Sequence, residues 1–333
     1  MSAPLEKELL SRWQEWFNES PPASVELLAV GRRYRNSYTL LPFPNGGQEP
    51  VCVVKVAAGE EQASKLRREF GNLTLLRTRL TDQALLDSFP CPLALVHRAG
   101  LVVAIHSYVS GRSLPSALSY PHQREVIPRV LDSVAEWLVA FQAATKSEAP
   151  APDNGHGDLA DALASADEIE LLRQMEGNGL ATPQKMSGVW GFQHGDLKPE
   201  HVLWRGRSIG VVDWDEMRSG SVTSDWFYFL ALSALQIGGV ESNRQLGQAA
   251  PTLEAVFFCR HWFGELAMQA THRFLDRLSL PRSMAAPLFV LSICRDGRYL
   301  WPYLAQGASG AYRDVVRLLH HRWGDLVFNR AAA

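Results

Sequence analysis

The sequence predicts an α+β fold in which a small, mostly β-stranded N-terminal lobe precedes a larger, mostly helical C-terminal lobe. Two observations support this prediction. Short apolar runs typical of strands recur between residues 25 and 105, where one strong helical pattern interrupts them. From about Arg112 onward the apolar residues recur at helical spacing, and the only remaining strand pattern is a hairpin at 202–212.

The N-terminal part divides into an extension and a lobe. Residues 5–17 place Leu5, Leu9, Trp13 and Trp16 on one face of a helix, for which packing onto the lobe is favoured over docking a partner. In the lobe, a helix is expected at Ser64–Leu80 and strands at Val25–Val30, Tyr38–Leu41, Val51–Val56, Leu93–Val96 and Leu101–Ile105. We assign residues 1–24 to the extension, 25–107 to the N-terminal lobe and 108–333 to the C-terminal lobe.

The C-terminal lobe is predicted from helical patterns separated by polar loops. Val130–Thr145 is strongly amphipathic, and the apolar run from Trp226 to Val240 indicates a buried helix, because it is too short to span a bilayer comfortably. Polar loops are expected at 148–156 and 238–248. A last helical block is expected at 252–325.

Composition narrows the class of protein. The chain has 333 residues and a net charge of −2, which gives no electrostatic reason to expect nucleic acid or an anionic membrane as a partner. Its four cysteines are scattered without metal-ligand spacing, as is usual in a reducing compartment. The N-terminus lacks the apolar core of a signal peptide. We therefore expect a cytoplasmic protein that has no membrane span.

The richest segment for chemistry is His194–Asp215. The sequence His194-Gly195-Asp196-Leu197-Lys198-Pro199-Glu200-His201 precedes two short apolar runs joined by a polar turn, which predicts a hairpin. The start of one hairpin strand lies opposite the end of the other, so His201 and Asp213 are expected side by side, with Asp196 just before them. Carboxylates beside an imidazole can bind a divalent metal and orient a nucleophile, and phosphoryl transfer needs both.

A second copy of four of these letters tests the interpretation. His156-Gly157-Asp158-Leu159 precedes helical sequence, and no Asp-Trp pair follows it at the right distance. A helix N-terminus capped by Asp158 explains this copy better. The four letters alone are therefore a weak signal, and the hairpin with its second aspartate distinguishes the later copy.

The later copy resembles the aminoglycoside phosphotransferase and choline kinase group, whose members are small-molecule kinases with a two-lobed protein-kinase-like fold. The resemblance implies that Asp196 is the catalytic aspartate and Asp213 a metal ligand. Leu197-Lys198-Pro199-Glu200 also resembles the catalytic loop of Ser/Thr protein kinases, which implies that Lys198 contacts the transferred phosphate. One position departs from the family, which has asparagine where His201 stands. The resemblance implies ATP and Mg2+ as cofactors. Because an imidazole is a softer ligand than an amide oxygen, Mn2+ is the alternative metal if His201 is a ligand.

The nucleotide side is expected in the N-terminal lobe. Lys55 lies in an apolar strand and Glu69 on the apolar face of the next helix, so an inward ion pair is predicted. The resemblance implies that this pair holds the α- and β-phosphates of ATP, and that the Ser107 carbonyl and the Val109 amide hold the adenine. The turn expected from Gly31 onward contains no other glycine. Its arginines, Arg32, Arg33 and Arg35, either contact phosphates or are solvated turn residues, and the sequence does not favour one over the other.

The remaining candidates are supporting residues. Asp225 caps the helix that follows it or, by the resemblance, also binds the backbone of the catalytic loop, while His194 is favoured as a structural histidine. No spacing singles out an acceptor-binding residue in the last helical block, where the candidates are His261, Trp262, Glu265, Arg295, Asp296, Arg298, Tyr299, Trp301 and Tyr303.

The predicted function is ATP-dependent phosphorylation of a hydroxyl on a small molecule, such as a sugar, an amino sugar or an amino alcohol. A nucleotide-binding pseudokinase is the first alternative, because of His201 and the glycine-poor turn. A protein kinase is the second, suggested by Leu197-Lys198-Pro199-Glu200. The twelve residues from Asp213 to Asp225 leave little room for a peptide-docking activation segment.

Overall fold

The computed structural model describes residues 7, 10–17, 20–22, 24–34, 37–44, 46–98, 100–115, 123–146, 190–239, 248–293 and 309–330. The chain forms two compact units. The first contains Met1–Ser110 and Gly210–Glu216, and the second contains Gly111–Ile209 and Met217–Ala333. The border at Ser110 lies close to the lobe border expected at residue 107, and the short segment Gly210–Glu216 groups with the first unit.

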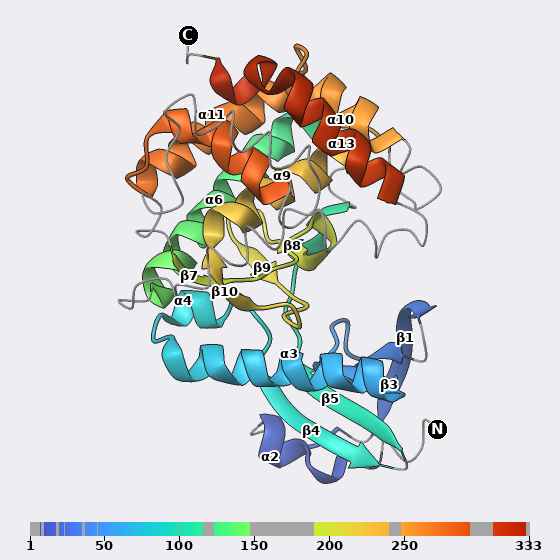
Figure 1. Ribbon diagram of the computed structural model, residues 1–333. Coiled ribbons are helices and arrows are strands. Elements are labelled where there is room, and N and C mark those ends of the chain that lie inside the picture. The colour runs from blue at the N-terminus through green and yellow to red at the C-terminus, as the bar shows by residue number, and fades with distance from the viewer. Residues whose placement is uncertain are drawn as a thin grey trace. The chain divides into compact units, whose positions relative to one another are not determined.

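The first unit is a five-stranded antiparallel sheet with strand order β1-β2-β3-β5-β4 (Figure 1). Its strands are β1 (Val25–Tyr34), β2 (Ser37–Pro44), β3 (Cys52–Ala58), β4 (Pro92–Arg98) and β5 (Leu101–Ser107). The helices are α2 (Trp13–Phe17), α3 (Glu60–Arg79) and α4 (Gln83–Leu86). The predicted strands and the predicted long helix are thus all present, and α3 begins four residues earlier than expected.

The two faces of this sheet have different apolar partners because side chains alternate along each strand. Trp13 of α2 packs in a cluster with Cys52, Val54 and Ile105. Ala104 of β5 packs in a second cluster with residues of α3, among them Leu66. The sheet is therefore covered on one face by α3 and on the other by α2, as expected for an N-terminal helix that packs onto its own lobe.

One sequence expectation for this unit is wrong. Residues 31–34 were expected to form a turn, but they are part of strand β1. The pairing of β1 with β2 shifts register after Val30, and Tyr34 then pairs with Ser37. An irregularity in the pairing lets the strand accommodate a glycine and two arginines that look like loop residues in sequence. The side chains of Arg32 and Arg33, and the whole of Arg35, lie outside the described residues.

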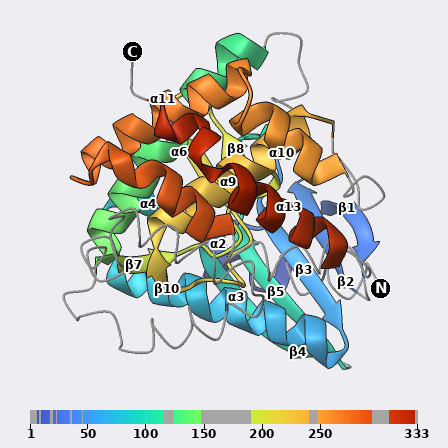
Figure 2. The same cartoon turned by 45° about the horizontal axis from the view of Figure 1, so that its top comes forward.

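The second unit is mainly helical (Figure 2). Its long helices are α6 (Gln123–Thr145), α9 (Val222–Ile237), α10 (Ala249–Phe257), α11 (Trp262–Arg277) and α13 (Ser309–Arg322). Short 3-10 turns are η2 (Pro199–His201), η4 (Arg282–Met284), η5 (Trp323–Asp325) and η6 (Val327–Asn329). The buried centre of the unit is α9, where Trp226, Phe227 and Phe229 are at most 1% exposed. The run from Trp226 is therefore a buried helix, as predicted.

Outside the five-stranded sheet the chain also holds short strands, some of which the sequence did not reveal. The predicted hairpin is confirmed as β8 (Val202–Trp204) and β9 (Ile209–Val211), whose turn is closed by Arg205 N donating to Ser208 O at 2.9 Å. In addition, β6 (Arg112–Ser113) pairs with β8, and β7 (Trp190–Gln193) pairs with β10 (Arg218–Ser221). The expectation of a hairpin alone is wrong because these strands have two to four residues, too few to show an alternating pattern.

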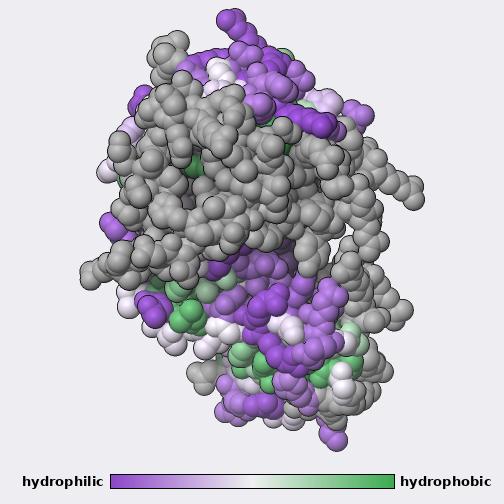
Figure 3. Space-filling model, in the orientation of Figure 1, coloured by the Kyte–Doolittle hydropathy of each residue, from purple (hydrophilic) through white to green (hydrophobic). Residues whose placement is uncertain are grey.

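Polar residues dominate the described part of the surface that Figure 3 shows, with small hydrophobic patches between them. In α3 the side chains of Arg67 and Arg68 are 37% and 53% exposed, whereas Arg77 donates to Leu86 O at 2.9 Å and lies over the ring of Phe89. Within the ranges that the structure describes, no helix is both long enough and apolar enough to cross a membrane.

Candidate functional site

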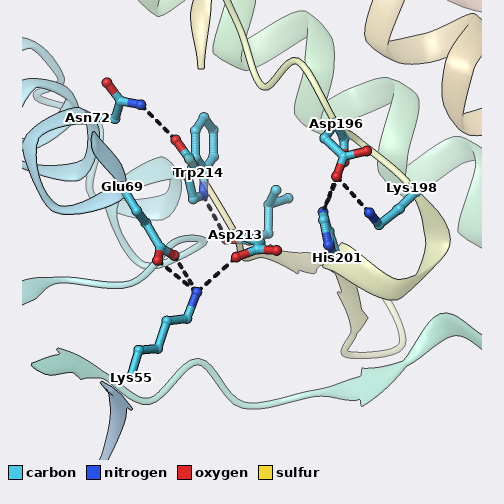
Figure 4. A network of polar contacts seen from close by, with 9 residues as sticks. Lys55, Glu69, Asn72, Asp196, Lys198, His201, Asp213 and Trp214 are labelled. Atoms are coloured by element: carbon cyan, nitrogen blue, oxygen red, sulfur yellow. Dashed lines mark hydrogen bonds and ion pairs between the residues drawn. The ribbon is translucent and has the colours of Figure 1, made fainter. Parts of the chain in front are cut away.

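The first unit contains a buried ionic cluster, here called the Lys55 cluster, made of Lys55, Glu69 and Asp213 (Figure 4). The Nζ atom of Lys55 lies 2.7 and 2.8 Å from the two Glu69 carboxylate oxygens and 2.9 Å from Oδ1 of Asp213. Lys55 comes from β3, Glu69 from α3 and Asp213 from the segment after β9. The predicted inward ion pair of Lys55 and Glu69 is therefore present, and Asp213 joins it.

Burial controls the electrostatics of this cluster. The Glu69 side chain is only 2% exposed, so its charge depends on the lysine beside it. Burial alone lowers the pKa of Lys55, but the carboxylates of Asp213 and Glu69 outweigh it and raise this pKa above its ordinary value. Lys55 is therefore a fixed cation. Asp213 is 43% exposed on its side chain and remains open to a ligand.

The backbone at Asp213 is held in an unusual conformation. Its φ angle is 72°, in the left-handed region that only a few non-glycine residues adopt, aspartate among them. The next residue, Trp214, is fully buried, donates from Nε1 to Val211 O at 3.0 Å and packs edge-on against Phe89. Its carbonyl accepts a 2.7 Å hydrogen bond from Asn72 of α3. These contacts fix the direction in which Asp213 projects.

A neighbouring carboxylate shares this environment. Asp215 follows Trp214, and burial together with the negative charges of Asp213, Glu216 and Glu69 raises its pKa to about 7. Arg68, 3.9 Å from Glu216, and Lys65, which acts to lower the pKa of Asp215, offset part of this negative charge, but burial and the carboxylates outweigh the effect of Lys65 on Asp215. Such an excess of carboxylate favours the binding of an additional cation.

The second unit contains a second cluster, here called the Asp196 cluster, in the loop between β7 and η2 (Figure 4). Oδ2 of Asp196 accepts a 2.6 Å hydrogen bond from Nζ of Lys198. Oδ1 lies 3.3 Å from the hydroxyl of Tyr228, which comes from α9. His201 contributes Nδ1, which lies 2.9 Å from the carbonyl oxygen of Asp196 and 3.7 Å from Oδ2. Three of the four side chains thus come from one short stretch of chain.

The backbone of the loop that carries Asp196 is hydrogen-bonded to a side chain of α9. The carboxylate of Asp225, which is 2% exposed, accepts hydrogen bonds from His194 N at 2.7 Å and from Gly195 N at 2.9 Å. Gly195 has a φ angle of 85°, a conformation that favours glycine. Of the two roles expected for Asp225, the contact to the loop backbone is present, whereas the helix cap is Ser221. The capping expectation failed because α9 begins at Val222, four residues before the apolar run that starts at Trp226.

His194 has the structural position that was expected for it. Its side chain is fully buried, and its Nδ1 accepts a hydrogen bond from Asp196 N at 3.2 Å. The contact fixes the tautomer in which Nδ1 is unprotonated. His194 therefore helps to shape the loop that presents the Asp196 carboxylate.

The candidate metal ligands are Asp213 and His201, and their surroundings can be compared with what Mg2+ requires. Among the described residues, no group of three or more His, Cys, Asp or Glu side chains converges on one point. Mg2+ is commonly held by one or two carboxylates together with substrate phosphates and water, so the accessible carboxylate of Asp213 suits it. The Nδ1 atom of His201 is engaged with the Asp196 carbonyl. The expected position of His201 beside Asp213 remains a prediction.

The other candidates divide into described and undescribed residues. Ser107 is bonded to Cys91 through both its backbone N–H, at 2.8 Å, and its hydroxyl, at 2.7 Å, and Val109 is 5% exposed. His261 caps α11, and Trp262 packs under Arg124. The decoy at 156–159 lies outside the described residues. So do six of the acceptor candidates, namely Arg295, Asp296, Arg298, Tyr299, Trp301 and Tyr303.

Three residues of interest were missed from the sequence. Asn72 and Tyr228 lie within apolar helical patterns, and His106 lies within an apolar strand, so each looked like part of the core. A general signal was available, because a buried phenol, amide or imidazole needs a hydrogen-bond partner. Only the folded chain shows that the partners are the Trp214 carbonyl for Asn72 and the Asp196 carboxylate for Tyr228.

Comparison with known proteins agrees with this geometry. The sequence profile of the phosphotransferase enzyme family matches residues 45–259, more than half of the chain. No curated protein sequence matches the chain significantly. Two similar solved structures each have a TM-score of 0.51. One is an amicoumacin kinase in complex with AMP-PNP, Ca2+ and Ami, which is 12% identical, and the match covers 98% of this chain and 96% of that one. The other is a choline kinase from Cryptosporidium parvum Iowa II, which is 8% identical, with 96% and 94% covered. Together they confirm the protein-kinase-like fold.

Proposed function

The chain belongs to the phosphotransferase enzyme family, and we propose that it transfers the γ-phosphoryl group of ATP to a hydroxyl of a small molecule. The observation that carries the proposal is the Asp196 cluster, in which a loop carboxylate is oriented by a lysine and a tyrosine and its backbone is clamped by Asp225. A carboxylate presented in this way can receive an alcohol proton.

The Lys55 cluster supplies the nucleotide side of the proposed reaction. Lys55 binds the α- and β-phosphates, and Glu69 keeps the lysine in position. Asp213 holds the divalent metal, which supplies charge neutralisation for the phosphates when it is bound. The adenine is bound by the Ser107 carbonyl and the Val109 amide. When the phosphates bind, the Lys55 ammonium replaces part of its contact with Asp213 by contact with the phosphate oxygens.

The Asp196 cluster supplies the acceptor side. Asp196 accepts a hydrogen bond from the acceptor hydroxyl, aligns its oxygen with the γ-phosphorus and takes its proton as the new P–O bond forms and the bond to ADP breaks. In this structure the Lys198 ammonium is bonded to Oδ2 of Asp196. During the reaction it turns toward the phosphoryl oxygens and offsets the negative charge that develops there. The protein therefore acts by positioning and by fixed charge.

A small hydroxylated acceptor is the class that suits these features. The chain passes from Asp213 through the four-residue strand β10 directly into α9, which leaves little sequence for a peptide-docking segment. The two structures named above are kinases of amicoumacin and of choline. Choline carries a quaternary ammonium group near its hydroxyl, which supports an acceptor with a nitrogen group near its hydroxyl. We therefore rank amino sugars and amino alcohols above simple sugars.

The test is a screen for acceptor-dependent ADP formation. The purified protein is incubated with MgATP and a panel of streptomycin, gentamicin, choline, 1-amino-2-propanol and simple sugars, and products are identified by mass. We expect one class to show an added phosphate, with Asp196→Asn inactive on the same compound. ADP release without a phosphorylated product would count against acceptor transfer.

A pseudokinase is the second candidate, and one observation favours it. His201 occupies the position of the family's asparagine, and its Nδ1 is directed at the Asp196 carbonyl. A protein that binds MgATP with an ordinary affinity and yet transfers phosphate to none of these acceptors, in Mg2+ or in Mn2+, would establish this candidate. Binding and turnover therefore need to be measured on the same preparation.

A further inference from the structure

Helix α3 contacts the segment after β9 with side chains from one of its faces. Asn72 follows Arg68 by four positions and Glu69 by three, so the three side chains lie on the same side of the helix. Nδ2 of Asn72 donates to the Trp214 carbonyl oxygen at 2.7 Å (Figure 4). Nε of Arg68 lies 3.4 Å from the Asp215 carbonyl oxygen. The contact made by Asn72 is the shorter of the two and therefore the stronger.

The same helix binds Trp214 at both of its backbone polar groups. Burial raises the pKa of the Glu69 carboxyl, and a hydrogen bond from the backbone N–H of Trp214 opposes this rise. That N–H belongs to the peptide group that joins Asp213 to Trp214, whereas the carbonyl bonded to Asn72 belongs to the next peptide group. Glu69 and Asn72 thus fix the two peptide groups that flank Trp214, and a rotation of the backbone there would break one contact or both.

Asp213 depends on this support because of its own backbone conformation. Its φ angle of 72° lies in the left-handed region, which a non-glycine residue keeps only where the surrounding structure holds it. Its side chain is 43% exposed, and Oδ1 is bonded to Lys55. Since so little packing surrounds the carboxylate, its direction is set largely by the backbone that α3 holds.

The amide of Asn72 has no role within its own helix. Asn72 lies in the middle of α3, where asparagine is a weaker helix former than leucine. Thr74, two positions further on, donates to the Phe70 carbonyl inside the helix, whereas Asn72 donates to another segment. The contact to Trp214 therefore explains this residue better than the needs of the helix do.

We propose that Asn72 is a positioning residue for the divalent metal, because its hydrogen bond to the Trp214 carbonyl keeps the Asp213 carboxylate in the direction that binds the ion. The inference rests on the proposed function, in which Asp213 holds the metal that accompanies ATP. Replacing a residue that orients a metal ligand without touching the metal commonly lowers metal affinity by about 10- to 100-fold. Asn72 should therefore control the affinity for Mg2+, whereas Lys55 controls the contact to phosphate.

The first test measures metal-dependent binding without turnover. Isothermal titration of the full chain with AMP-PNP, in EDTA and in excess Mg2+, gives the factor by which the metal tightens nucleotide binding. Asn72→Leu keeps the approximate size of the side chain and removes the donor, so it should reduce this factor by about tenfold and leave the Kd in EDTA within about twofold. Asn72→Gln keeps an amide donor and should restore most of the factor.

A change of charge separates positioning from simple electrostatics. Asn72→Asp has the same shape, lacks the N–H donor and adds a negative charge one residue from the metal ligand. Added charge alone would raise the affinity for Mg2+, whereas loss of the donor should lower the factor by about tenfold. Thr74→Asp adds the same charge on the exposed side of the same helix and should leave the factor within about twofold. This pair applies even if Asn72→Leu does not fold.

Steady-state kinetics supply a signature that a structural role alone would not produce. With an acceptor found by the screen, Asn72→Leu should raise the KM for Mg2+ at saturating ATP by about tenfold, and excess Mg2+ should restore kcat to within about twofold. A loss of kcat that excess Mg2+ does not restore contradicts the inference, as does an unchanged binding factor in Asn72→Leu or Asn72→Asp. The expected binding pattern without phosphoryl transfer contradicts the proposed function alone. Wild-type nucleotide binding that Mg2+ does not tighten contradicts both.

Discussion

The Lys55 cluster and the Asp196 cluster are built in opposite ways. Lys55 is separated from Glu69 by 14 positions and from Asp213 by 158, so tertiary structure alone brings the three charges together. Asp196 and Lys198 are two positions apart, and His201 follows within the same loop. The first cluster therefore depends on the sheet and on α3, whereas the second depends on a local loop and on the helix α9 beneath it.

This difference has energetic consequences. Removing Lys55 leaves the buried Glu69 carboxylate without its cation, which is costly, whereas removing either carboxylate leaves Lys55 bonded to the other one. In the Asp196 cluster the Asp196 side chain is also largely buried, at 10% exposed, and the loop backbone relies on one carboxylate of α9. We expect the first cluster to be sensitive to changes in its charged side chains and the second to changes in its support.

The largest effect is expected at Lys55. Lys55→Ala removes the phosphate contact and leaves Glu69 buried and unpaired, so kcat/KM for ATP should fall by ~10²-fold or more. Glu69→Ala should have a smaller effect because it only positions the lysine. The double variant should lose less than the sum of the single losses when steady-state kinetics are compared. Strict additivity would show that the two residues do not act as a pair.

The next effect concerns the support of the catalytic loop. Asp225→Ala leaves the buried N–H groups of His194 and Gly195 without acceptors, which should lower the free energy of unfolding by about 2–4 kcal/mol and reduce turnover. Urea unfolding monitored by tryptophan fluorescence measures the first quantity. Asp132→Ala, which removes an exposed ion pair with Arg273, should change stability by less than about 1 kcal/mol. Equal losses of unfolding free energy in the two variants would mean that Asp225 does not stabilise the loop more than an exposed ion pair would.

A smaller effect is expected at Tyr228. Its hydroxyl lies 3.3 Å from Oδ1 of Asp196, which is longer than the usual O–H···O distance, so it orients the carboxylate weakly before the acceptor binds. Tyr228→Phe should lower kcat by about three- to tenfold with KM for ATP unchanged. In the Asp196→Asn background the same change should have almost no further effect. A full additional loss there would indicate a purely structural tyrosine.

The smallest effect is expected at His201. Its Nδ1 hydrogen bond to the Asp196 carbonyl can be imitated by an asparagine amide, and Mg2+ on Asp213 can be completed by phosphate and water. His201→Asn should therefore keep the turnover in Mg2+ within about threefold or raise it slightly. Parallel assays in Mg2+ and Mn2+ check this point. A wild-type enzyme that works only with Mn2+, and a variant that regains Mg2+, would instead make His201 a metal ligand.

The sequence could predict the local features of this molecule but few of the long-range ones. Lys55 and Glu69 were paired correctly because each sits in a strongly periodic element, and the 202–212 hairpin was predictable from its turn. The pairing of β7 with β10 was not, since four-residue strands with glycine and serine have no alternating signal. Tyr228 and His106 were hidden for a different reason, because a polar side chain within an apolar run does not say which group it faces.

The account is tested most directly at Asp196, whose carboxylate is the one group proposed to take the acceptor proton. With an acceptor identified by the screen, or with water if ATP hydrolysis alone is detectable, Asp196→Asn should reduce kcat by ~10²-fold or more and leave the Kd of MgATP within about twofold. Asp158→Asn, in the other His-Gly-Asp-Leu segment, should leave both quantities almost unchanged. Equal losses of turnover in the two variants, or loss of MgATP binding in Asp196→Asn, would contradict the assignment of Asp196 as the catalytic aspartate.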